Sequence, residues 1–320
     1  MICLGIETTA HTFGVGIVTS DKKVLANVKD SYTTVSGGMV PADLAEHHAK
    51  CADKVILSAI SKAGLKLSDI DLISFSQGPG IGSALRVGSI AAKALSNVLG
   101  KPIVGVNHCI AHLEIGKMLT CAKDPILLYA SGANTQIIAF EGGKYRIFGE
   151  TLDMGVGNML DQLARVFGIG FPGGPKIAKL AELGKNYVEL PYVVKGMDFS
   201  FGGILTNVKQ KLKDYSKEDL CYSLQETVFA MMVEASERAI AHCGKKELLL
   251  GGGVACNKRL FEMAQTMCDE NGYECYGLSN EFNTDNGAMI AWLGIKKFAE
   301  NSGMDFLDLE IRPYWRTDEA

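Results

Sequence analysis

Apolar and polar positions in the first part of the chain predict a hairpin of two strands followed by a third strand. Residues 2–8 (ICLGIET) and 14–18 (GVGIV) are apolar runs of strand length, and a polar turn joins them. Residues 22–28 (KKVLANV) supply the next strand. Because turn-forming polar residues separate these runs, we expect an antiparallel hairpin with one added strand.

The same layout returns in the second part of the chain. Residues 126–132 (ILLYASG) and 136–140 (QIIAF) form a second predicted hairpin, and residues 143–150 add a third strand. Aligning Glu7 with Ser131 gives an offset of about 124 residues between the two copies. The pattern therefore predicts an internal duplication.

Helical and mixed segments follow each hairpin. Apolar residues at helical spacing mark residues 47–64, which end in glycine, and residues 222–243. Residues 67–100 and 246–268 each read as a strand, a glycine-rich turn and a helix. This alternation of strands and helices predicts parallel α/β sheets.

Two duplicated α/β halves predict two lobes with a central cleft. This layout resembles the actin-like ATPase (ASKHA) superfold of actin, sugar kinases and Hsp70, in which each hairpin turn faces the phosphates of a nucleotide. We expect an N-terminal lobe over residues 1–122 and a C-terminal lobe over residues 123–295, built from βββαβα-type subdomains. The segment 296–320 is expected to pack back on the N-terminal lobe.

Composition restricts the class of protein. The chain of 320 residues is 47% hydrophobic and 21% charged, and its nine cysteines include no CxxC pair. Scattered cysteines are typical of free thiols in a reducing compartment. The sequence has no apolar stretch of membrane-spanning length, and its first residues lack the features of a signal peptide. We therefore expect a cytoplasmic protein without a membrane partner.

The net charge of −4 gives no overall attraction to nucleic acid. A nucleic-acid partner would have to meet a local basic patch. Six lysines are candidates for such a patch: Lys195, Lys209, Lys211, Lys213, Lys245 and Lys246. The same lysines are compatible with an ordinary solvated surface. We therefore expect partner subunits to supply much of any nucleic-acid contact.

The segment NHCIAH (107–112) places His108 and His112 one helical turn apart. Asn107 is a preferred N-cap residue, so both imidazoles are expected on the first turns of a helix. The positive end of a helix disfavours imidazolium and leaves ring nitrogens available as metal ligands. Two unrelated histidines on one helix face would give the same spacing. A zinc protease is disfavoured because Cys109 stands where its HExxH motif requires glutamate.

A metal ion needs ligands beyond two histidines, and the second half of the chain offers two candidates. Asp285 precedes a predicted helix, and Tyr129 lies at the mouth of the second hairpin. A cleft between two lobes would bring both to the histidine pair. Asp285 is explained equally well as a helix cap, as are Thr284 and Asn286, and Tyr129 as an ordinary strand aromatic. A mixed nitrogen and oxygen set favours iron or zinc over magnesium.

Glycine-rich loops at strand ends suggest a nucleotide site. The run 251–253 lies between a strand and a helix, and SGANTQ (131–136) forms the second hairpin turn, so exposed amides at both places suit a phosphate. Similar loops recur at 77–84 and 171–176. Ordinary turns are the alternative. Asp161 could hold a ribose hydroxyl or pair with the arginine four residues later.

Eight segments in order, spread over nearly the whole chain, resemble the universal tRNA threonylcarbamoyltransferase family (Kae/TsaD/Gcp type). They are NHCIAH, YASGANTQ, FGETLDMGVGNMLDQLAR, FPGGPKIAKLAELG, LPYVVKGMDFSFGGILT, YSLQET, GGGVACNKRL and DNGAMIAW. The archaeal branch, the catalytic subunit of the KEOPS complex, is the most similar. The resemblance implies an ASKHA fold and transfer of threonylcarbamoyl from its adenylate to N6 of adenosine 37 in tRNAs reading codons that begin with A.

Carried over by position, the resemblance implies one metal site and one substrate site, with no catalytic residue separate from the metal ligands. The implied metal ligands are His108, His112, Tyr129 and Asp285. The implied adenylate-binding residues are Tyr129, Ala130, Ser131, Gly132, Ala133, Asn134, Asp161, Gly174, Ala178 and Asn257, with Gly251, Gly252 and Gly253 as the nucleotide loop. One divalent metal ion per subunit is implied, iron before zinc, and ATP or AMP can occupy the adenylate site.

Three positions depart from the family pattern. Ala133 replaces the second glycine of SGGNT, Ala178 stands where a glutamate contacts the sugar, and Thr8 stands where archaeal relatives often have glycine. A methyl group at Ala133 narrows the approach of a phosphate to the backbone. These departures put substrate affinity in question more than the type of reaction.

We expect the metal to polarise the carbamate–phosphate end of the substrate while the adenine amine attacks the activated carbonyl. The resemblance implies tRNA and KEOPS-type partners: a Bud-type kinase, a Pcc-type dimerising subunit and a Cgi-type subunit. Some archaea fuse the kinase behind this domain; here the chain ends at RTDEA, so a separate or removed kinase is expected. Two alternatives remain, an ASKHA-fold small-molecule kinase and a non-catalytic nucleotide-binding scaffold subunit.

Overall fold

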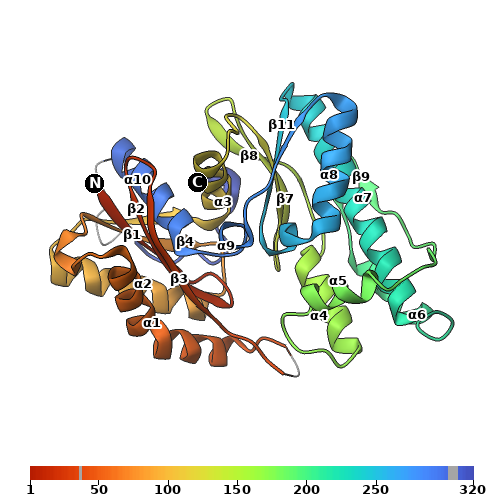
Figure 1. The fold of residues 1–320 in the computed structure, drawn as a ribbon, viewed down its shortest axis with the longest axis horizontal. Helices are drawn as coiled ribbons and strands as arrows, with labels where there is room; N and C mark the ends of the chain where they lie inside the picture. The colour runs from red at the N-terminus through yellow and green to blue at the C-terminus, as the bar shows by residue number, and fades with distance from the viewer. Residues whose placement is uncertain (36–37, 302–308) are drawn as a thin grey trace. The chain divides into compact units, whose positions relative to one another are not determined.

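A computed structural model describes residues 1–35, 38–301 and 309–320, with residue 301 described by its backbone alone. The chain forms two compact units, each with its own sheet (Figure 1). Unit 1 comprises Met1–Tyr32, Met39–Leu119 and Thr284–Ala320. Unit 2 comprises Thr33–Gly38 and Thr120–Asn283.

The sheet of unit 1 has the strand order β3-β2-β1-β4-β5. Its strands are β1 (Ile2–Glu7), β2 (Thr12–Thr19), β3 (Val24–Ser31), β4 (Leu72–Gly78) and β5 (Ile103–Asn107). The first three strands pair antiparallel, whereas β4 and β5 add in parallel. Strand β4 is buried at every position, and so is β1 after its first residue; the nearly continuous apolar run of β1 matches burial on both faces.

Helices cover both faces of this sheet (Figure 1). On one face lie α1 (Pro41–Ala63) and α2 (Gly82–Leu99), and on the other lies α10 (Gly287–Asn301), beside α3 (His108–Leu119). Two 3₁₀ turns complete the unit, η1 (Leu67–Asp69) and η4 (Thr317–Glu319). The unit is therefore a three-layer α/β arrangement.

Two glycines let α10 lie directly on the strands. Gly5 and Gly16 are cross-strand partners in β1 and β2. A Cβ atom on either would lie 2.2 or 2.1 Å from the α10 backbone. Their neighbours Leu4 and Ile17, pointing to the opposite face, belong to the apolar core that includes residues of α1. Because side chains alternate along a strand, these positions present apolar side chains to the layer that contains α1 and only backbone to α10.

The sheet of unit 2 has the strand order β12-β11-β6-β7-β8, which repeats the order of unit 1 when it is read from β8 to β12. Its strands are β6 (Ile126–Ala130), β7 (Thr135–Glu141), β8 (Lys144–Glu150), β11 (Glu247–Gly251) and β12 (Glu274–Tyr276). Again the first three are antiparallel and the last two parallel. The predicted duplication and the α/β fold class are confirmed, because each strand of unit 1 has a counterpart at the same place in the order.

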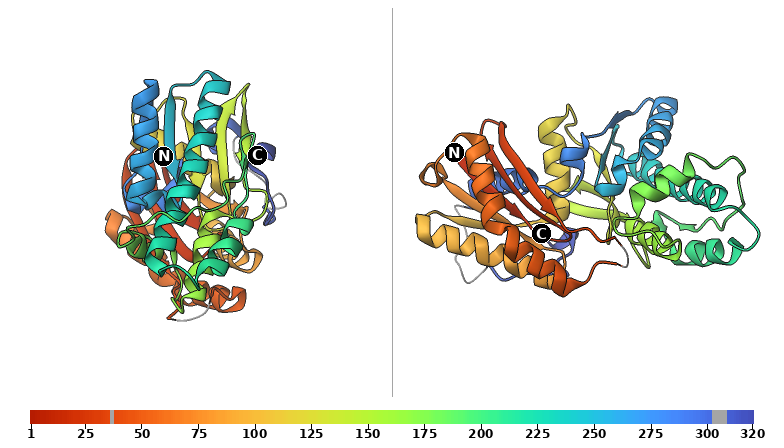
Figure 2. Two further views of the ribbon diagram at one scale, coloured as in Figure 1. Left: turned by 90° about the vertical axis from the view of Figure 1, so that its right-hand side faces the viewer. Right: turned by 60° about the horizontal axis from the view of Figure 1, so that its bottom comes forward.

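The helices of unit 2 surround a larger apolar core. They are α4 (Val156–Val166), α5 (Gly174–Ala181), α6 (Gly202–Lys211), α7 (Lys217–Cys243), α8 (Lys258–Asn271) and α9 (Asn280–Asn283). A short hairpin of β9 (Val194–Lys195) and β10 (Asp198–Phe199) and the 3₁₀ turn η2 (Gly253–Cys256) complete the unit. The long helix α7 runs beside α8, as Figure 2 shows.

The last part of the chain contacts the first sheet. The α10 helix, which the sequence analysis counted in the lobe 123–295, packs on β1 and β2 and belongs to unit 1. Residues 309–320 contact the glycine loop 77–84: Gln77 Nε2 donates to Glu310 O at 2.7 Å, and Gly80 N donates to Pro313 O at 3.1 Å. The side-chain amide of Gln77 and the backbone amide of Gly80 are therefore hydrogen-bonded to other residues of unit 1.

Within the part of the chain that is described, no helix has both the length and the apolar character needed to cross a bilayer. All nine cysteines are free thiols, as their scattered spacing predicts. Five of the nine are buried, and these pack as small apolar side chains.

Candidate active site

The helix α3 begins where the sequence predicts. Asn107 Oδ1 accepts hydrogen bonds from the backbone N–H groups of Cys109 (3.0 Å) and Ile110 (3.2 Å), so Asn107 caps the helix. His108 and His112 follow on successive turns, with ring centroids 4.9 Å apart. Their side chains are 4% and 0% exposed. The helix therefore carries two buried imidazoles near its positive end.

A carboxylate at the start of α10 faces these histidines. Asn286 Oδ1 accepts a hydrogen bond from Met289 N at 3.1 Å, so Asn286 caps α10. Asp285 instead points its carboxylate at His108 and His112. The alternative in which Asp285 is a plain helix cap is therefore wrong.

The three groups converge at distances that suit a shared ion. Asp285 Oδ1 lies 3.4 Å from His108 Nε2 and 3.5 Å from His112 Nε2. These separations are long for hydrogen bonds but match the edge of about 3.4 Å between ligands of a tetrahedral ion with bonds of about 2.0–2.1 Å. Within the described residues, this trio is one of two groups whose potential ligand atoms all lie within 4.8 Å of one another. Two imidazoles and a carboxylate fit iron or zinc.

Electrostatics favours the forms that bind a cation. Burial raises the pKa of Asp285, but the imidazoles of His108 and His112 beside its carboxylate outweigh burial and hold that pKa well below its usual range. Burial lowers the pKa of His112, against the opposing effect of Asp285. A carboxylate and a neutral imidazole are the protonation states that a metal requires.

Glu7 orients His108 from the end of β1. Its Oε2 lies 2.9 Å from His108 Nδ1, and its Oε1 accepts hydrogen bonds from Thr9 N (2.6 Å) and Thr9 Oγ1 (2.5 Å). A carboxylate that accepts a hydrogen bond from Nδ1–H leaves the lone pair of Nε2 in the same ring for the ion, as is usual around metal-bound histidine. The sequence analysis missed Glu7. The available signal was a charged residue ending an apolar strand, where a buried carboxylate needs a partner.

In unit 2, the turn between β6 and β7 is closed by Ser131. Its N–H and its Oγ both donate to Asn134 O, each at 2.9 Å. Gly132 and Ala133, at the tip of the turn, are exposed. Gly157 N, in the first turn of α4, donates to Ser131 O at 3.0 Å. The predicted phosphate-binding turn is therefore an exposed backbone tip braced by a helix end.

Asp161 connects α4 to the beginning of α5. Its Oδ1 accepts a hydrogen bond from Gly173 N at 2.7 Å. Gly174 is the first residue of α5, and Ala178 lies one turn further along that helix. The fold thus brings these three predicted substrate residues onto neighbouring elements. Ala178 is half-buried and offers a methyl group, so it supplies no carboxylate to a sugar.

The loop after β11 depends on glycine. Gly252 has φ 96° and ψ 164°, a conformation that is essentially restricted to glycine. A Cβ atom there would lie 2.4 Å from Ala130 O, so the loop passes directly over the end of β6. Gly251 pairs with Tyr129 in the sheet, and Gly253 is exposed. The predicted nucleotide loop therefore lies next to the predicted phosphate turn.

Asn257 follows this loop and caps α8. Its Oδ1 accepts hydrogen bonds from Arg259 N at 2.8 Å and Leu260 N at 3.4 Å, while its Nδ2 donates to Gln225 Oε1 at 2.9 Å. The side chain thus fixes the end of the loop to α7 as well as to α8. Ala130 to Asn134, Asp161, Gly174, Ala178, the glycine loop and Asn257 all belong to unit 2.

Two other predictions have different outcomes. Lys245 is buried and pairs with Asp124 at 2.5 Å, so it is not part of a basic surface patch. Tyr129 is buried at the end of β6 in unit 2, whereas His108 and Asp285 belong to unit 1. The role of Tyr129 as a fourth metal ligand stays a prediction.

Comparison with known proteins decides the family. The family model described as TsaD, tRNA N6-adenosine threonylcarbamoyltransferase, matches residues 23–292. The chain belongs to this family. It is 54% identical over 322 residues to the tRNA N6-adenosine threonylcarbamoyltransferase of Thermococcus kodakarensis, covering 100% of this chain and 98% of the relative. The relative of the same name from Nanoarchaeum equitans is 51% identical over 316 residues, covering 99% of each.

Other members of the TsaD family carry additional sequence. A relative from Methanosarcina barkeri, named as a bifunctional tRNA threonylcarbamoyladenosine biosynthesis protein, is 50% identical over 320 residues. The alignment covers 99% of this chain but 58% of that protein. The resemblance drawn from the eight sequence segments is thus confirmed, and TsaD members are tRNA-modifying transferases.

Solved structures show the fold. The HypF structure from T. kodakarensis superposes with a TM-score of 0.66 at 14% identity, covering 94% of this chain and 48% of HypF. A ROK family glucokinase from Streptomyces griseus gives a TM-score of 0.52 at 13% identity, covering 92% and 100%. At such identities the likeness concerns fold alone. It confirms the predicted actin-like ATPase fold of this TsaD member.

Proposed function

We propose that this chain transfers the threonylcarbamoyl group from threonylcarbamoyl-adenylate to N6 of adenosine 37 in tRNAs that read codons beginning with A. The match of the TsaD family model to residues 23–292 carries the proposal. The relatives named tRNA N6-adenosine threonylcarbamoyltransferase, which align over almost their whole length, support it. The protein is proposed to act in the cytoplasm, where its tRNA substrate is found.

His108, His112 and Asp285 are proposed to hold one divalent metal ion, iron before zinc. Two observations support this assignment: Asp285 Oδ1 lies 3.4 Å from His108 Nε2 and 3.5 Å from His112 Nε2, and the pKa of Asp285 is lowered by the histidines while that of His112 is lowered by burial. A bound ion would supply Lewis-acid polarisation of the substrate's carbamate–phosphate end. Glu7 would hold the Nδ1 proton of His108 and keep Nε2 directed at the ion. Tyr129 is the proposed fourth ligand on the family resemblance alone.

The adenylate is proposed to bind unit 2. The exposed tip of the 131–134 turn would accept its phosphate, because backbone amides there can approach an anion closely. Asp161 and Gly174 would border the nucleoside, and Gly251, Gly252 and Gly253 would form the opposite loop. ATP or AMP would compete for the same residues. No side chain is required as a covalent nucleophile, since the substrate is already activated.

Partner subunits are proposed to supply much of the tRNA contact. The net charge of −4 provides no overall attraction to a polyanion, and Lys245 is buried and paired with Asp124. The KEOPS-type partners expected from the resemblance are a Bud-type kinase, a Pcc-type dimerising subunit and a Cgi-type subunit. The bifunctional relatives, whose length exceeds the aligned part, are compatible with a kinase encoded in the same chain.

The proposal is tested by incubating the chain with threonylcarbamoyl-adenylate and a tRNA that decodes an A-starting codon, with and without the partner subunits. Mass spectrometry of tRNA nucleosides should detect threonylcarbamoyladenosine, and a tRNA with guanosine at position 37 should stay unmodified. Absence of product even with all partners would contradict the proposal. ATP turnover with a small alcohol would favour a kinase, and partner binding without either activity would favour a scaffold.

A further inference from the structure

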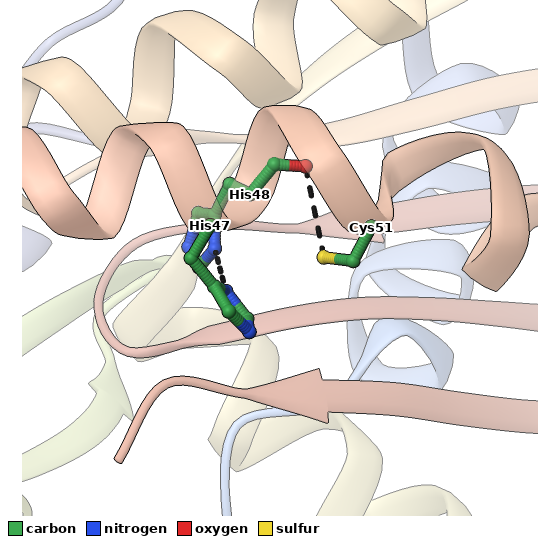
Figure 3. Close-up of side chains that lie close together, drawn as sticks. All are labelled: His47, His48 and Cys51. Atoms are coloured by element: carbon green, nitrogen blue, oxygen red, sulfur yellow. Dashed lines mark hydrogen bonds between the residues drawn. The ribbon is translucent and has the colours of Figure 1, made fainter. Parts of the chain in front are cut away.

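His47, His48 and Cys51 form a second cluster of potential metal ligands in unit 1. Figure 3 shows the three side chains on α1, and their ligand atoms all lie within 4.8 Å of one another. Cys51 follows His48 by three residues and His47 by four, the two spacings that place side chains on one face of a helix. His48 is fully buried, Cys51 is buried, and the His47 side chain is 23% exposed. The sequence analysis read this segment only as an apolar helix.

The hydrogen-bond partners of the two rings fix where their protons lie. His48 Nε2 is 2.9 Å from the carbonyl oxygen of Ala10, which can only accept, so this nitrogen carries the proton. His47 Nε2 is 3.0 Å from Asp30 Oδ1, and an ionised carboxylate likewise only accepts. In each neutral ring the other nitrogen, Nδ1, is then the one with a lone pair. A carbonyl and a carboxylate are also the usual outer partners of metal-bound histidines.

The two Nδ1 atoms face each other at 3.2 Å. Two lone pairs at this distance repel, so a proton or a metal ion must lie between them. Two imidazole ligands of a tetrahedral zinc ion, with bonds of about 2.0–2.1 Å, are separated by about 3.3 Å. The observed spacing is therefore that of two ligands of one ion. A proton would account for the two nitrogens but would give no reason for a thiol beside them.

Cys51 supplies the third group. Its thiol donates to His48 O at 3.6 Å, which holds the sulfur on the side of the helix that carries the rings (Figure 3). In a tetrahedral site, sulfur and nitrogen ligands lie about 3.5 Å apart. The ligand atoms here lie within 4.8 Å of one another, so Sγ would have to move by at most about 1.3 Å to reach that spacing. Burial raises the pKa of the Cys51 thiol to about 11 and lowers the pKa of His48 to about 4. His48 is thus a neutral ligand, and a metal would have to displace the thiol proton.

Neighbouring rings limit the rotation of the two imidazoles. Phe13 packs edge-on against His48 with centroids 5.7 Å apart, and Tyr32 packs edge-on against His47 at 5.9 Å. The histidines are therefore held by an outer hydrogen bond and an aromatic wall each. Such support is what a metal site with fixed ligand directions needs.

We propose that His47 Nδ1, His48 Nδ1 and Cys51 Sγ bind one thiophilic transition-metal ion of the zinc class, with solvent at the fourth position. Binding forms two metal–nitrogen bonds and one metal–sulfur bond, and it releases to water both the thiol proton and the proton that otherwise lies between the two Nδ1 atoms. Two nitrogens and a thiolate exclude magnesium and calcium, which prefer oxygen ligands. Through Ala10 and Asp30 the ion would connect α1 to the β1–β2 turn and to β3. Its role is structural.

Cobalt(II) titration of the metal-depleted full chain tests the proposal. A thiolate-to-cobalt charge-transfer band should grow to one equivalent, because the trio of His108, His112 and Asp285 contains no sulfur. Cys51→Ser keeps a donor for the His48 carbonyl and should abolish the band. Cys109→Ser, which changes a buried cysteine beside the other histidine pair, should retain it. Asp30→Ala should weaken cobalt binding by about 10–100-fold, because it removes the outer partner of His47.

Zinc should also raise the melting temperature of the wild-type chain more than that of the Cys51→Ser variant. Circular dichroism of each variant checks that it is folded. Absence of the band in folded wild-type protein would show that a proton holds the histidine pair and would overturn the proposal. Persistence of the band in Cys51→Ser, or its loss in Cys109→Ser alone, would overturn it as well.

Discussion

The first hairpin turns of the two units are copies of one element, but each carries its candidate functional groups in a different way. In unit 1, the turn follows Glu7, the last residue of β1, whose carboxylate holds His108. In unit 2, Ser131, which aligns with Glu7, closes its turn on Asn134 and leaves the tip exposed. The turn of unit 1 therefore acts through a buried side chain, whereas the turn of unit 2 exposes backbone groups at its tip.

This difference determines which substitutions each copy tolerates. A site made of side chains fails when a functional group is removed, although the backbone remains intact. A site made of backbone fails when a Cβ atom is added where the chain needs glycine. The two halves of one fold should therefore respond to opposite kinds of mutation.

The largest expected effect is the loss of a side chain in unit 1. His108→Ala should lower the rate of threonylcarbamoyl transfer by at least about a hundredfold, since even an outer-shell partner of a metal ligand is worth about 10–100-fold. Nucleoside mass spectrometry of the tRNA measures the rate, and circular dichroism should show an unchanged fold. His242→Ala, at an exposed position on α7, serves as the control and should keep wild-type activity. Retained transfer activity in His108→Ala would show that the reaction does not depend on a metal ion held by His108.

The next effect is the addition of a methyl group in unit 2. Gly252→Ala should destabilise the chain by about 2 kcal/mol, because an L residue is strained at φ 96° and its Cβ would meet Ala130 O at 2.4 Å. Gly253→Ala is the matched control: no atom lies within 4 Å of its Cβ, so it should cost less than about 0.5 kcal/mol. Urea unfolding measures both. Equal stabilities of the two variants would show that this loop does not depend on glycine.

A smaller effect is expected from Glu7→Gln. The amide oxygen can still accept a hydrogen bond from His108 Nδ1, but the negative charge is lost, so metal affinity should fall about tenfold. Competition with a fluorescent chelator measures the affinity. Glu270→Gln, at an exposed position on α8, should leave the affinity unchanged. An unchanged affinity in Glu7→Gln would mean that Glu7 has no part in holding the metal ligand.

The smallest effect is expected at the tip of the unit 2 turn. Ala133→Gly removes an exposed methyl group beside the proposed phosphate position. Adenylate affinity should rise by about twofold, since exposed substitutions change free energies by about 0.5 kcal/mol or less. Calorimetric titration with AMP measures it. A weaker affinity would show that the methyl group helps to order the turn.

The duplicated layout of the fold could be predicted from the sequence, but the place of α10 could not. Strand-length apolar runs and glycine turns mark both sheets, and the same strand order appears in each. The contacts of α10 with Gly5 (to Ala291) and Gly16 (to Ala288) join residues 286 and 272 positions apart, so no local pattern predicts them. An apolar helix near the end of a chain gives no indication of which sheet it covers.

The candidate site was predictable where its chemistry is local. The HxxxH spacing and the Asn107 cap identify the histidine pair, because both features lie within one helical turn. Thr284, Asp285 and Asn286 are all suitable helix caps, so the sequence alone does not show which of them caps α10. The hydrogen bond from Met289 N to Asn286 Oδ1 identifies Asn286 as the cap. Glu7 was missed because its partner lies 101 residues away.

The central claim, that His108, His112 and Asp285 hold one ion, is tested most directly by elemental analysis of protein purified without chelator or affinity tag. The Cys51→Ser background removes the second candidate site from the count. We expect about one equivalent of iron or zinc per chain in Cys51→Ser, and none when His108→Ala and His112→Ala are added. Equal metal content in the two proteins would contradict the claim.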